Sequence, residues 1–110
     1  MHEMSFAQAI VENVLKLAEE KGAKKVSKVL VEMGELLLIN PEQLEFCFQV
    51  ASSGTIAEGA VLELEFIKPH IECLLCGKRY DEPIAICECG GIIKVEGGKD
   101  MVIRKIEMEV

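Results

Sequence analysis

Two close pairs of cysteines, Cys73-Leu74-Leu75-Cys76 and Cys87-Glu88-Cys89, hold four of the five cysteines in the chain. Glycine follows each pair, as Gly77 and as Gly90-Gly91. Zn²⁺ prefers four ligands at tetrahedral corners, and a short turn between two cysteines presents two thiolates to one ion. The glycines let the backbone curl beneath the metal, where a Cβ atom would clash. The spacing therefore predicts a zinc site on Cys73, Cys76, Cys87 and Cys89.

Disulfides and unrelated core cysteines are the alternatives to a metal site. Disulfides need an oxidising compartment, and no apolar signal segment opens the chain, so we expect a cytoplasmic protein. The fifth cysteine, Cys47, falls in the apolar stripe of an expected helix and is interpreted as a small buried hydrophobe. His70, three residues before the first pair, is an extra zinc ligand, a donor to a ligand, or an exposed residue at a strand end. We favour the last of these.

Length and charge limit the classes of function. The chain has 110 residues, half of them apolar, and a net charge of −7, which suits one domain or one domain with a small appendage. No apolar run approaches the ~18 residues that span a membrane. Four thiolates on one Zn²⁺ add a local charge of −2. Because an acidic chain without a basic stripe repels phosphate, nucleic-acid binding is disfavoured.

Two helices are expected in the first half of the chain. The first runs from Ser5, as N-cap with Gln8 in a capping box, to Lys21, and ends at Gly22. The second begins after Asn40 as N-cap, with Pro41 at the first helical position, and ends at Ser52-Ser53-Gly54. The apolar stripe of the second helix is Leu44, Cys47, Phe48 and Ala51, widened by Phe46 and Val50.

Three strands are expected, at Val26–Met33, Val61–Ile67 and Met101–Val110. The first two are joined through the second helix, a crossover long enough to make them parallel, and the third runs antiparallel. Leu30 points to the polar side of its strand, so both faces of that strand are expected to be partly covered. The apolar segment Glu35–Ile39 either prolongs the strand or forms an exposed contact patch, and burial is favoured.

The predicted fold class is α+β, with two helices on one face of a three-stranded mixed sheet and an inserted small zinc-ribbon-like domain. The α/β domain comprises residues 1–70 and 99–110. The cysteine-containing domain comprises residues 71–98.

The first residues of the chain offer a second kind of metal site. The Met1 amine, the His2 backbone nitrogen and the His2 imidazole can close adjoining chelate rings around one ion. The Glu3 amide, the Glu3 carboxylate or a group from elsewhere supplies a fourth donor. Such tetragonal nitrogen sets suit Ni²⁺ or Cu²⁺ better than Zn²⁺. The alternative is an exposed histidine without a role, and the pattern alone does not decide between them.

Catalytic constellations are missing from the sequence. It has no Ser or Cys spaced with a His and an acid, no phosphate-cradling glycine loop and no His-Glu-x-x-His motif. We therefore expect that the protein has no catalytic residues and is not an enzyme.

Taken together, these motifs resemble the HypA family, the nickel metallochaperones of [NiFe]-hydrogenase maturation. The resemblance rests on Met1-His2-Glu3-Met4-Ser5, on Glu32-Met33-Gly34-Glu35, on residues 54–60 and on the cysteine module. It implies transient Ni(II) held by His2 with Met1 and Glu3, and structural Zn(II) on the four cysteines. It also implies the HypB GTPase as a partner and delivery of nickel to the hydrogenase large subunit, and in some bacteria to urease.

The chain departs from the family pattern in two places. The second pair in the family is Cys-x-x-Cys, whereas Cys87 and Cys89 have one spacer, so these are the least secure ligands. The shorter loop implies strain, or the loss of one ligand to His70 or water. Some relatives carry an acid near the start of the second helix, where this chain has Asn40, which we assign to capping and not to nickel. A zinc-ribbon adaptor without nickel transfer, or a nucleic-acid-binding zinc module, remain alternative interpretations.

Overall fold

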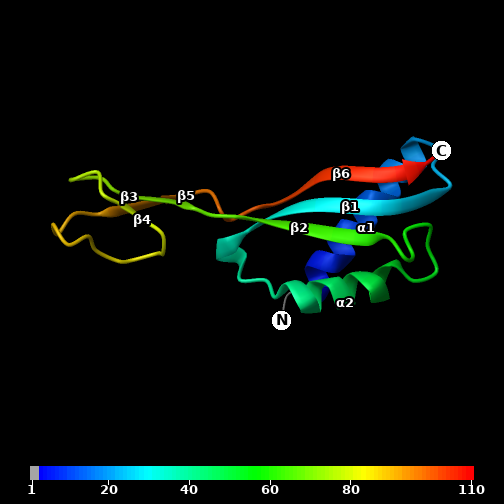
Figure 1. Ribbon diagram of the computed structural model, residues 1–110, viewed down its shortest axis with the longest axis horizontal. Coiled ribbons are helices and arrows are strands. Elements are labelled where there is room, and N and C mark those ends of the chain that lie inside the picture. Colours follow the sequence, from blue (N-terminus) through cyan, green and yellow to red (C-terminus); the bar gives the residue numbers. More distant parts are fainter. Residues whose placement is uncertain (1–2) are drawn as a thin grey trace.

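The computed structural model describes residues 3–110, which form two helices and two small sheets. The elements are α1 (Glu3–Glu20), β1 (Lys25–Gly34), the 3₁₀ helix η1 (Glu35–Leu37), α2 (Pro41–Ser52), β2 (Val61–Ile67), β3 (His70–Cys73), β4 (Arg79–Tyr80), β5 (Ile93–Glu96) and β6 (Met101–Glu109). The sheets have the strand orders β2-β1-β6 and β4-β3-β5. They lie at opposite ends of an elongated molecule measuring 57 × 26 × 16 Å (Figure 1).

The β2-β1-β6 sheet is mixed, as predicted. β1 pairs with β2 in parallel and with β6 antiparallel, because the α2 crossover returns the chain in the direction of β1. The predicted bounds of β2 coincide with those observed, and those of β1 and β6 agree to within one residue.

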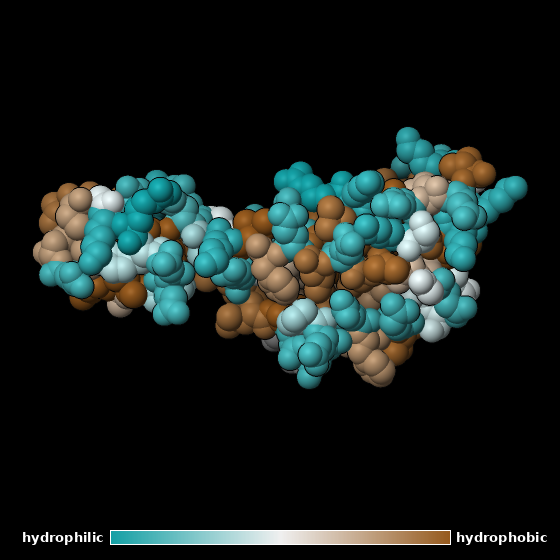
Figure 2. Space-filling model, in the orientation of Figure 1, coloured by the Kyte–Doolittle hydropathy of each residue, from teal (hydrophilic) through white to brown (hydrophobic). Residues whose placement is uncertain are grey.

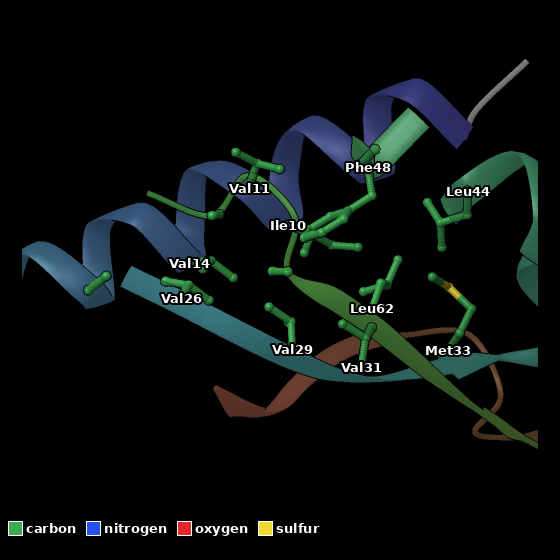
Figure 3. Packing of buried hydrophobic residues seen from close by; sticks show 14 of the residues in the cluster. Ile10, Val11, Val14, Val26, Val29, Val31, Met33, Leu44, Phe48 and Leu62 are labelled. Atoms are coloured by element: carbon green, nitrogen blue, oxygen red, sulfur yellow. The ribbon is translucent and has the colours of Figure 1, made fainter. Parts of the chain in front are cut away.

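Both helices pack on one face of this sheet. Figure 3 shows Ile10 and Val14 of α1 and Phe48 of α2 pointing toward Val29 and Val31 of β1, and all five side chains are fully buried. Burying an aliphatic or aromatic side chain contributes about 1.5–3 kcal/mol, so this layer supplies most of the stability of the larger sheet. Within the described residues, neither helix combines the length and apolar character that a membrane crossing requires.

The opposite face of the sheet is charged. Lys28 lies 3.0 Å from Glu63 across β1 and β2, and Arg104 lies 2.8 Å from Glu32 across β6 and β1. Leu30 is half-buried on this face. The stems of Lys28 and of other long side chains around it provide the partial cover expected of the second face.

α1 begins earlier than predicted. The expected N-cap at Ser5 is wrong, because Glu3 and Met4 are already helical. A carboxylate in the first turn is favourable at a helix N-terminus, and Glu3 occupies that turn. The end at Gly22 is confirmed: Gly22 has φ +67°, its N–H donates to Glu19, and Ala23 N–H donates to Ala18, which is a Schellman motif.

The predicted start of α2 is confirmed at Asn40, whose Oδ1 accepts a hydrogen bond from Gln43 N at 3.1 Å. In a capping box the Gln43 side chain would return to Asn40 N–H. That N–H instead donates to Glu3 Oε2 at 3.1 Å. The Glu3 carboxylate therefore joins the start of α1 to the start of α2.

The expected width of the α2 stripe is wrong. Phe46 is 69% exposed and Val50 is 49% exposed, whereas Leu44 and Phe48 are fully buried. The helix presents only its narrow face to α1 and the sheet. Cys47 is half-buried against the core, which is less than the full burial predicted.

The Glu35–Ile39 segment does not prolong β1 and is only partly buried. It forms η1 and then turns at Leu38, which is 86% exposed with a left-handed φ of 55°. Ile39 is buried. The predicted burial of this segment is therefore confirmed for Ile39 and wrong for Leu38.

Gly34 marks the place where the two sheets meet. A Cβ atom on Gly34 would lie 2.2 Å from the backbone carbonyl of Gly98, much closer than any real contact. Gly34 N–H donates to Asp100 and Leu36 N–H donates to Gly98, both at 2.9 Å. The end of β1 is thereby fixed against the segment that returns from the second sheet.

We expect Gly34→Ala to lower the free energy of unfolding by at least about 2 kcal/mol, because the added methyl group collides with backbone that hydrogen bonds hold in place. Urea unfolding followed by circular dichroism measures the change. Lys25→Ala, an exposed substitution on the same strand, should stay within about 0.5 kcal/mol. Equal stability of Gly34→Ala and the parent would contradict the close approach.

Candidate metal centre

The cysteines are positioned by the β4-β3-β5 sheet, which the sequence did not predict as a sheet. Cys73 is the last residue of β3, whose partners in the sheet are β4 and β5. Ile71, which is 1% exposed, anchors the middle of the sheet opposite Val95 and Tyr80. β4 has only two residues, so no alternating pattern was available to predict it.

The first cysteine pair lies in a tight turn after β3. Cys73 O accepts from Gly77 N at 3.0 Å, and Cys73 N donates to Lys78 O at 2.9 Å. The backbone N–H groups of Leu75 and Cys76 point at Cys73 Sγ, at 3.3 and 3.5 Å. Gly77 has a left-handed φ of +78°, and a Cβ atom on it would meet open space. Glycine is therefore needed here for the backbone conformation of the turn, and not to avoid a clash with the cysteines.

The shorter second pair fits into a β-turn. Gly90 N donates to Cys87 O at 2.8 Å and Cys87 N donates to Gly91 O at 3.2 Å. Gly90, the last residue of this turn, has a left-handed φ of +86°, which glycine adopts without steric cost. In the described part of the chain Leu38 is the one non-glycine residue with positive φ, so the shorter spacing does not produce the strained backbone that was expected.

Gly91 is the glycine that supplies clearance. A Cβ there would lie 2.6 Å from Cys73 Sγ and 3.2 Å from Cys89 Sγ. The predicted clash beneath the cysteines therefore holds at this glycine and not at Gly77 or Gly90.

The four sulfur atoms lie within 4.8 Å of one another. Cys73 Sγ is 3.6 Å from Cys89 Sγ, and Cys76 Sγ is 3.5 Å from Cys87 Sγ. A disulfide requires about 2.05 Å. Four sulfurs at 2.3 Å from a tetrahedral Zn²⁺ are about 3.8 Å apart, so the arrangement suits a closed tetrahedral thiolate site.

The polar surroundings favour thiolate at two of the sulfurs. The Tyr80 hydroxyl donates to Cys87 Sγ at 3.0 Å. That bond, followed by the amide of Cys89, lowers the pKa of the Cys87 thiol to about 6. It also raises the pKa of Tyr80. The backbone of Cys76 lowers the pKa of Cys73.

Cys89 favours the protonated thiol in the absence of a cation. The backbone of Gly91 acts to lower its pKa, but hydrogen bonding to the other three cysteine side chains outweighs this and raises the pKa of Cys89 to about 12. Thiolates this close repel one another, so the last proton is retained unless a positive ion replaces it. Soft thiolate donors in a tetrahedron select Zn²⁺ or iron over Mg²⁺ and Ca²⁺.

His70 lies outside the cluster of sulfurs. Its Nδ1 accepts from Arg79 Nη2 at 2.6 Å, and its Nε2 donates to Glu72 Oε2 at 3.1 Å. It is half-buried at the start of β3. The favoured interpretation, an exposed residue at a strand end, is confirmed for the position but wrong for the exposure, because the ring is half-buried and both of its nitrogens are bonded within the sheet.

The other predicted metal residues lie at the opposite end of the chain. Met1 and His2 are outside the described residues. Glu3 is buried, with its carboxylate bonded to Asn40 N. Asn40 caps α2, as assigned.

An α+β layer joined to a tetrathiolate module defines a small metal-binding protein. A model of the HypA family, described as "Hydrogenase/urease nickel incorporation, metallochaperone, hypA", matches residues 1–108, and the chain belongs to this family. It is therefore a metallochaperone of hydrogenase maturation and not an enzyme.

Relatives support this assignment over full length. A hydrogenase maturation factor HypA from Archaeoglobus fulgidus is 59% identical over all of both chains. One from Methanococcus aeolicus is 45% identical, covering 99% of this chain and 98% of its own. The solution structure of the Ni metallochaperone HypA from Helicobacter pylori, 22% identical, covers 99% of this chain and 98% of its own at a TM-score of 0.69; it shows the shared fold.

We expect Tyr80→Phe to move zinc release to higher pH. Losing the hydroxyl raises the pKa of Cys87 from about 6 toward its ordinary value, and protons then compete with metal earlier as the pH falls. The midpoint should rise by about half a unit to one unit. A pH titration of the zinc-loaded protein with a chromogenic chelator measures it, and an unchanged midpoint would show that the Tyr80–Cys87 contact does not affect metal retention.

Proposed function

We propose that the protein binds Ni(II) at its N-terminus and delivers it for maturation of [NiFe]-hydrogenase, while Zn(II) on the four cysteines has a structural role. The observation that carries the proposal is membership, over residues 1–108, of a family described by nickel incorporation. In this proposal residues 1–70 and 99–110 form the nickel-binding domain, and residues 71–98 form the zinc-binding domain.

Zinc is assigned to Cys73, Cys76, Cys87 and Cys89 because their sulfurs are spaced for a tetrahedron. Four protein ligands complete the shell of a structural zinc and leave no open position for chemistry. The exchangeable metal therefore belongs elsewhere.

Nickel is assigned to the Met1 amine, to the backbone nitrogen and imidazole of His2, and to Glu3. Glu3 is anchored, because its Oε2 accepts from Asn40 N at 3.1 Å. Because Glu3 begins α1 and its carboxylate contacts the start of α2, a metal held by Glu3 would lie at the starts of both helices. The Glu3 amide, the Glu3 carboxylate or a group from elsewhere in the fold supplies the fourth donor.

Delivery proceeds by ligand exchange in this proposal. Nickel on a terminal chelate is open to attack by a donor from a partner, which can add a ligand and draw the metal away. The HypB GTPase and the hydrogenase large subunit are the proposed partners. The similarity to hydrogenase maturation factors from Archaeoglobus fulgidus and Methanococcus aeolicus supports a place in hydrogenase maturation.

His2→Ala should lower nickel affinity at least tenfold by calorimetry on untagged protein, because the imidazole is lost. His70→Ala is the matched control and should bind nickel as the parent does. Acidification through the ordinary histidine pKa of about 6.5 should release nickel, since a protonated imidazole cannot bind. The nickel site fails if His2→Ala binds as tightly as the parent, or if His70→Ala loses nickel instead.

Substituting any one of the four clustered cysteines by serine should lower zinc affinity, whereas Cys47→Ser should retain one zinc per chain by elemental analysis. Cys89→Ser is the most informative change, because Cys89 belongs to the shorter pair. Retention of tightly bound zinc by Cys89→Ser would show that three cysteines suffice. Iron in place of zinc would contradict the metal assignment, and zinc without any nickel uptake would favour an adaptor over a metallochaperone.

A further inference from the structure

β2 is an edge strand of the larger sheet, because the order β2-β1-β6 leaves one of its sides without a partner strand in the described residues. Alternate N–H and C=O groups along Val61–Ile67 therefore face outward. Such an edge is a template for an added strand. The other edge, β6, carries charges of both signs at Arg104, Lys105 and Glu107, whereas the charges of β2, Glu63 and Glu65, are both acidic.

The side chains of β2 that face the helices become more exposed from the start of the strand to its end. Of the three side chains that point toward the helices, Leu62 is 5% exposed, Leu64 is half-buried and Phe66 is 38% exposed. Val61 is 56% exposed at the start of the strand. An additional strand beside β2 would cover the apolar surface that α2 leaves open.

A groove of about 390 Å³ runs between α2 and the start of β2. Its walls are Phe46 and Gln49 of α2 and residues 59–62. The Gln49 side chain donates to Ala60 O at 3.3 Å and ties the helix to the strand there. In Figure 2, apolar surface is visible in the region between β2 and α2 of Figure 1. An extended peptide that adds to a sheet edge places its alternate side chains in neighbouring pockets of this kind.

The rim of the groove is acidic. Glu42 and Glu45 of α2 line it and are exposed, in a chain of net charge −7. Basic side chains on an incoming strand would meet both carboxylates, and the apolar side chains between them would meet Phe46. Complementary charge chiefly raises the association rate and selects the partner.

We propose that the groove between α2 and the free edge of β2 takes up an extended, basic segment of a partner protein as a fourth strand. Backbone hydrogen bonds to β2 hold the segment, and Glu42, Glu45 and Phe46 select alternating basic and apolar side chains. This surface does not involve the cysteine cluster, and its proposal stands whether or not nickel binds at the N-terminus.

A second copy of the chain is a poorer occupant. Pairing of two β2 strands would bring together two acidic rims, together with Glu63 and Glu65 of each strand, and like charges facing each other are destabilising. Charge therefore favours a basic partner over self-association.

The test uses the full-length, zinc-loaded protein and a fluorescein-labelled heptapeptide of alternating lysine and valine. Fluorescence anisotropy should show binding, and ¹⁵N NMR shifts should concentrate on residues 61–67. The double variant Glu42→Lys/Glu45→Lys should weaken binding at least tenfold. Glu19→Lys/Glu20→Lys makes the same charge change at exposed positions of α1 and should weaken it less than threefold. A peptide with alternate backbone nitrogens methylated should lose binding, because it cannot pair with β2.

Four outcomes would overturn the proposal. These are no binding at millimolar peptide, equal losses in the two double variants, undiminished binding of the methylated peptide, and a stable dimer in sedimentation whose interface is β2. Equal losses would indicate general attraction to an acidic surface. A β2 dimer would assign the groove to a second copy. Both double variants should keep one zinc per chain, which separates this test from that of the metal sites.

Discussion

The architecture depends on one close approach of backbone to backbone, where Gly34 at the end of β1 meets Gly98. β2 and β6 lie on either side of β1 and both reach it at the Gly34 end, because Ile67 pairs with Gly34 and Met101 pairs with Met33. The chain that leaves β2 for the cysteine module and returns to β6 must therefore cross the end of β1. A side chain at Gly34 would occupy the space that the crossing needs, and hydrogen bonds on both sides of it hold the crossing in place.

A short path of contacts leads from this crossing to Glu3, where α1 begins. Gly98 O accepts from Leu36 N in η1, Ile39 is buried shortly after, and Asn40 N donates to Glu3. Residues 34–40 thus touch both the return from the cysteine module and the anchor of the N-terminus. The cysteine module and the N-terminal site proposed for nickel are consequently linked through residues 34–40. The two proposed metals have opposite requirements, because a structural zinc needs a closed shell and a nickel that is to be transferred needs an open one.

Local patterns predicted most of the fold, and contacts between distant residues account for what they missed. The bounds of β2 follow from strict alternation, and the start of α2 follows from the Asn40-Pro41 signal; both are readable within a few residues. The start of α1 was misplaced because its acidic first turn is held by an amide 37 residues away. Phe46 and Val50 were placed in the core because periodicity gives the face of a helix and not the width that its neighbours cover.

In the metal site, too, local sequence predicted some features, and contacts between distant residues determine the others. The spacing of the cysteines is enough to predict that the four sulfurs converge. It does not show that the shorter pair closes a regular β-turn, nor that Tyr80 reaches Cys87, since that contact depends on the pairing of the two-residue strand β4 with β3. Arg79 likewise comes close to His70 only through the pairing of β4 with β3.

The crossing also determines how the protein could be shortened or recombined. β2 and β6 are separated by β1, so the ends left by excising the cysteine module lie two strand spacings apart, about 10 Å. A two-residue hairpin turn cannot bridge that gap, and at least three extended residues are required. A replacement linker must also pass over Gly34 with small residues. A foreign module grafted at this position therefore needs termini about two strand spacings apart, with room for β1 between them. A simple hairpin insert has its termini on neighbouring strands and does not provide this spacing.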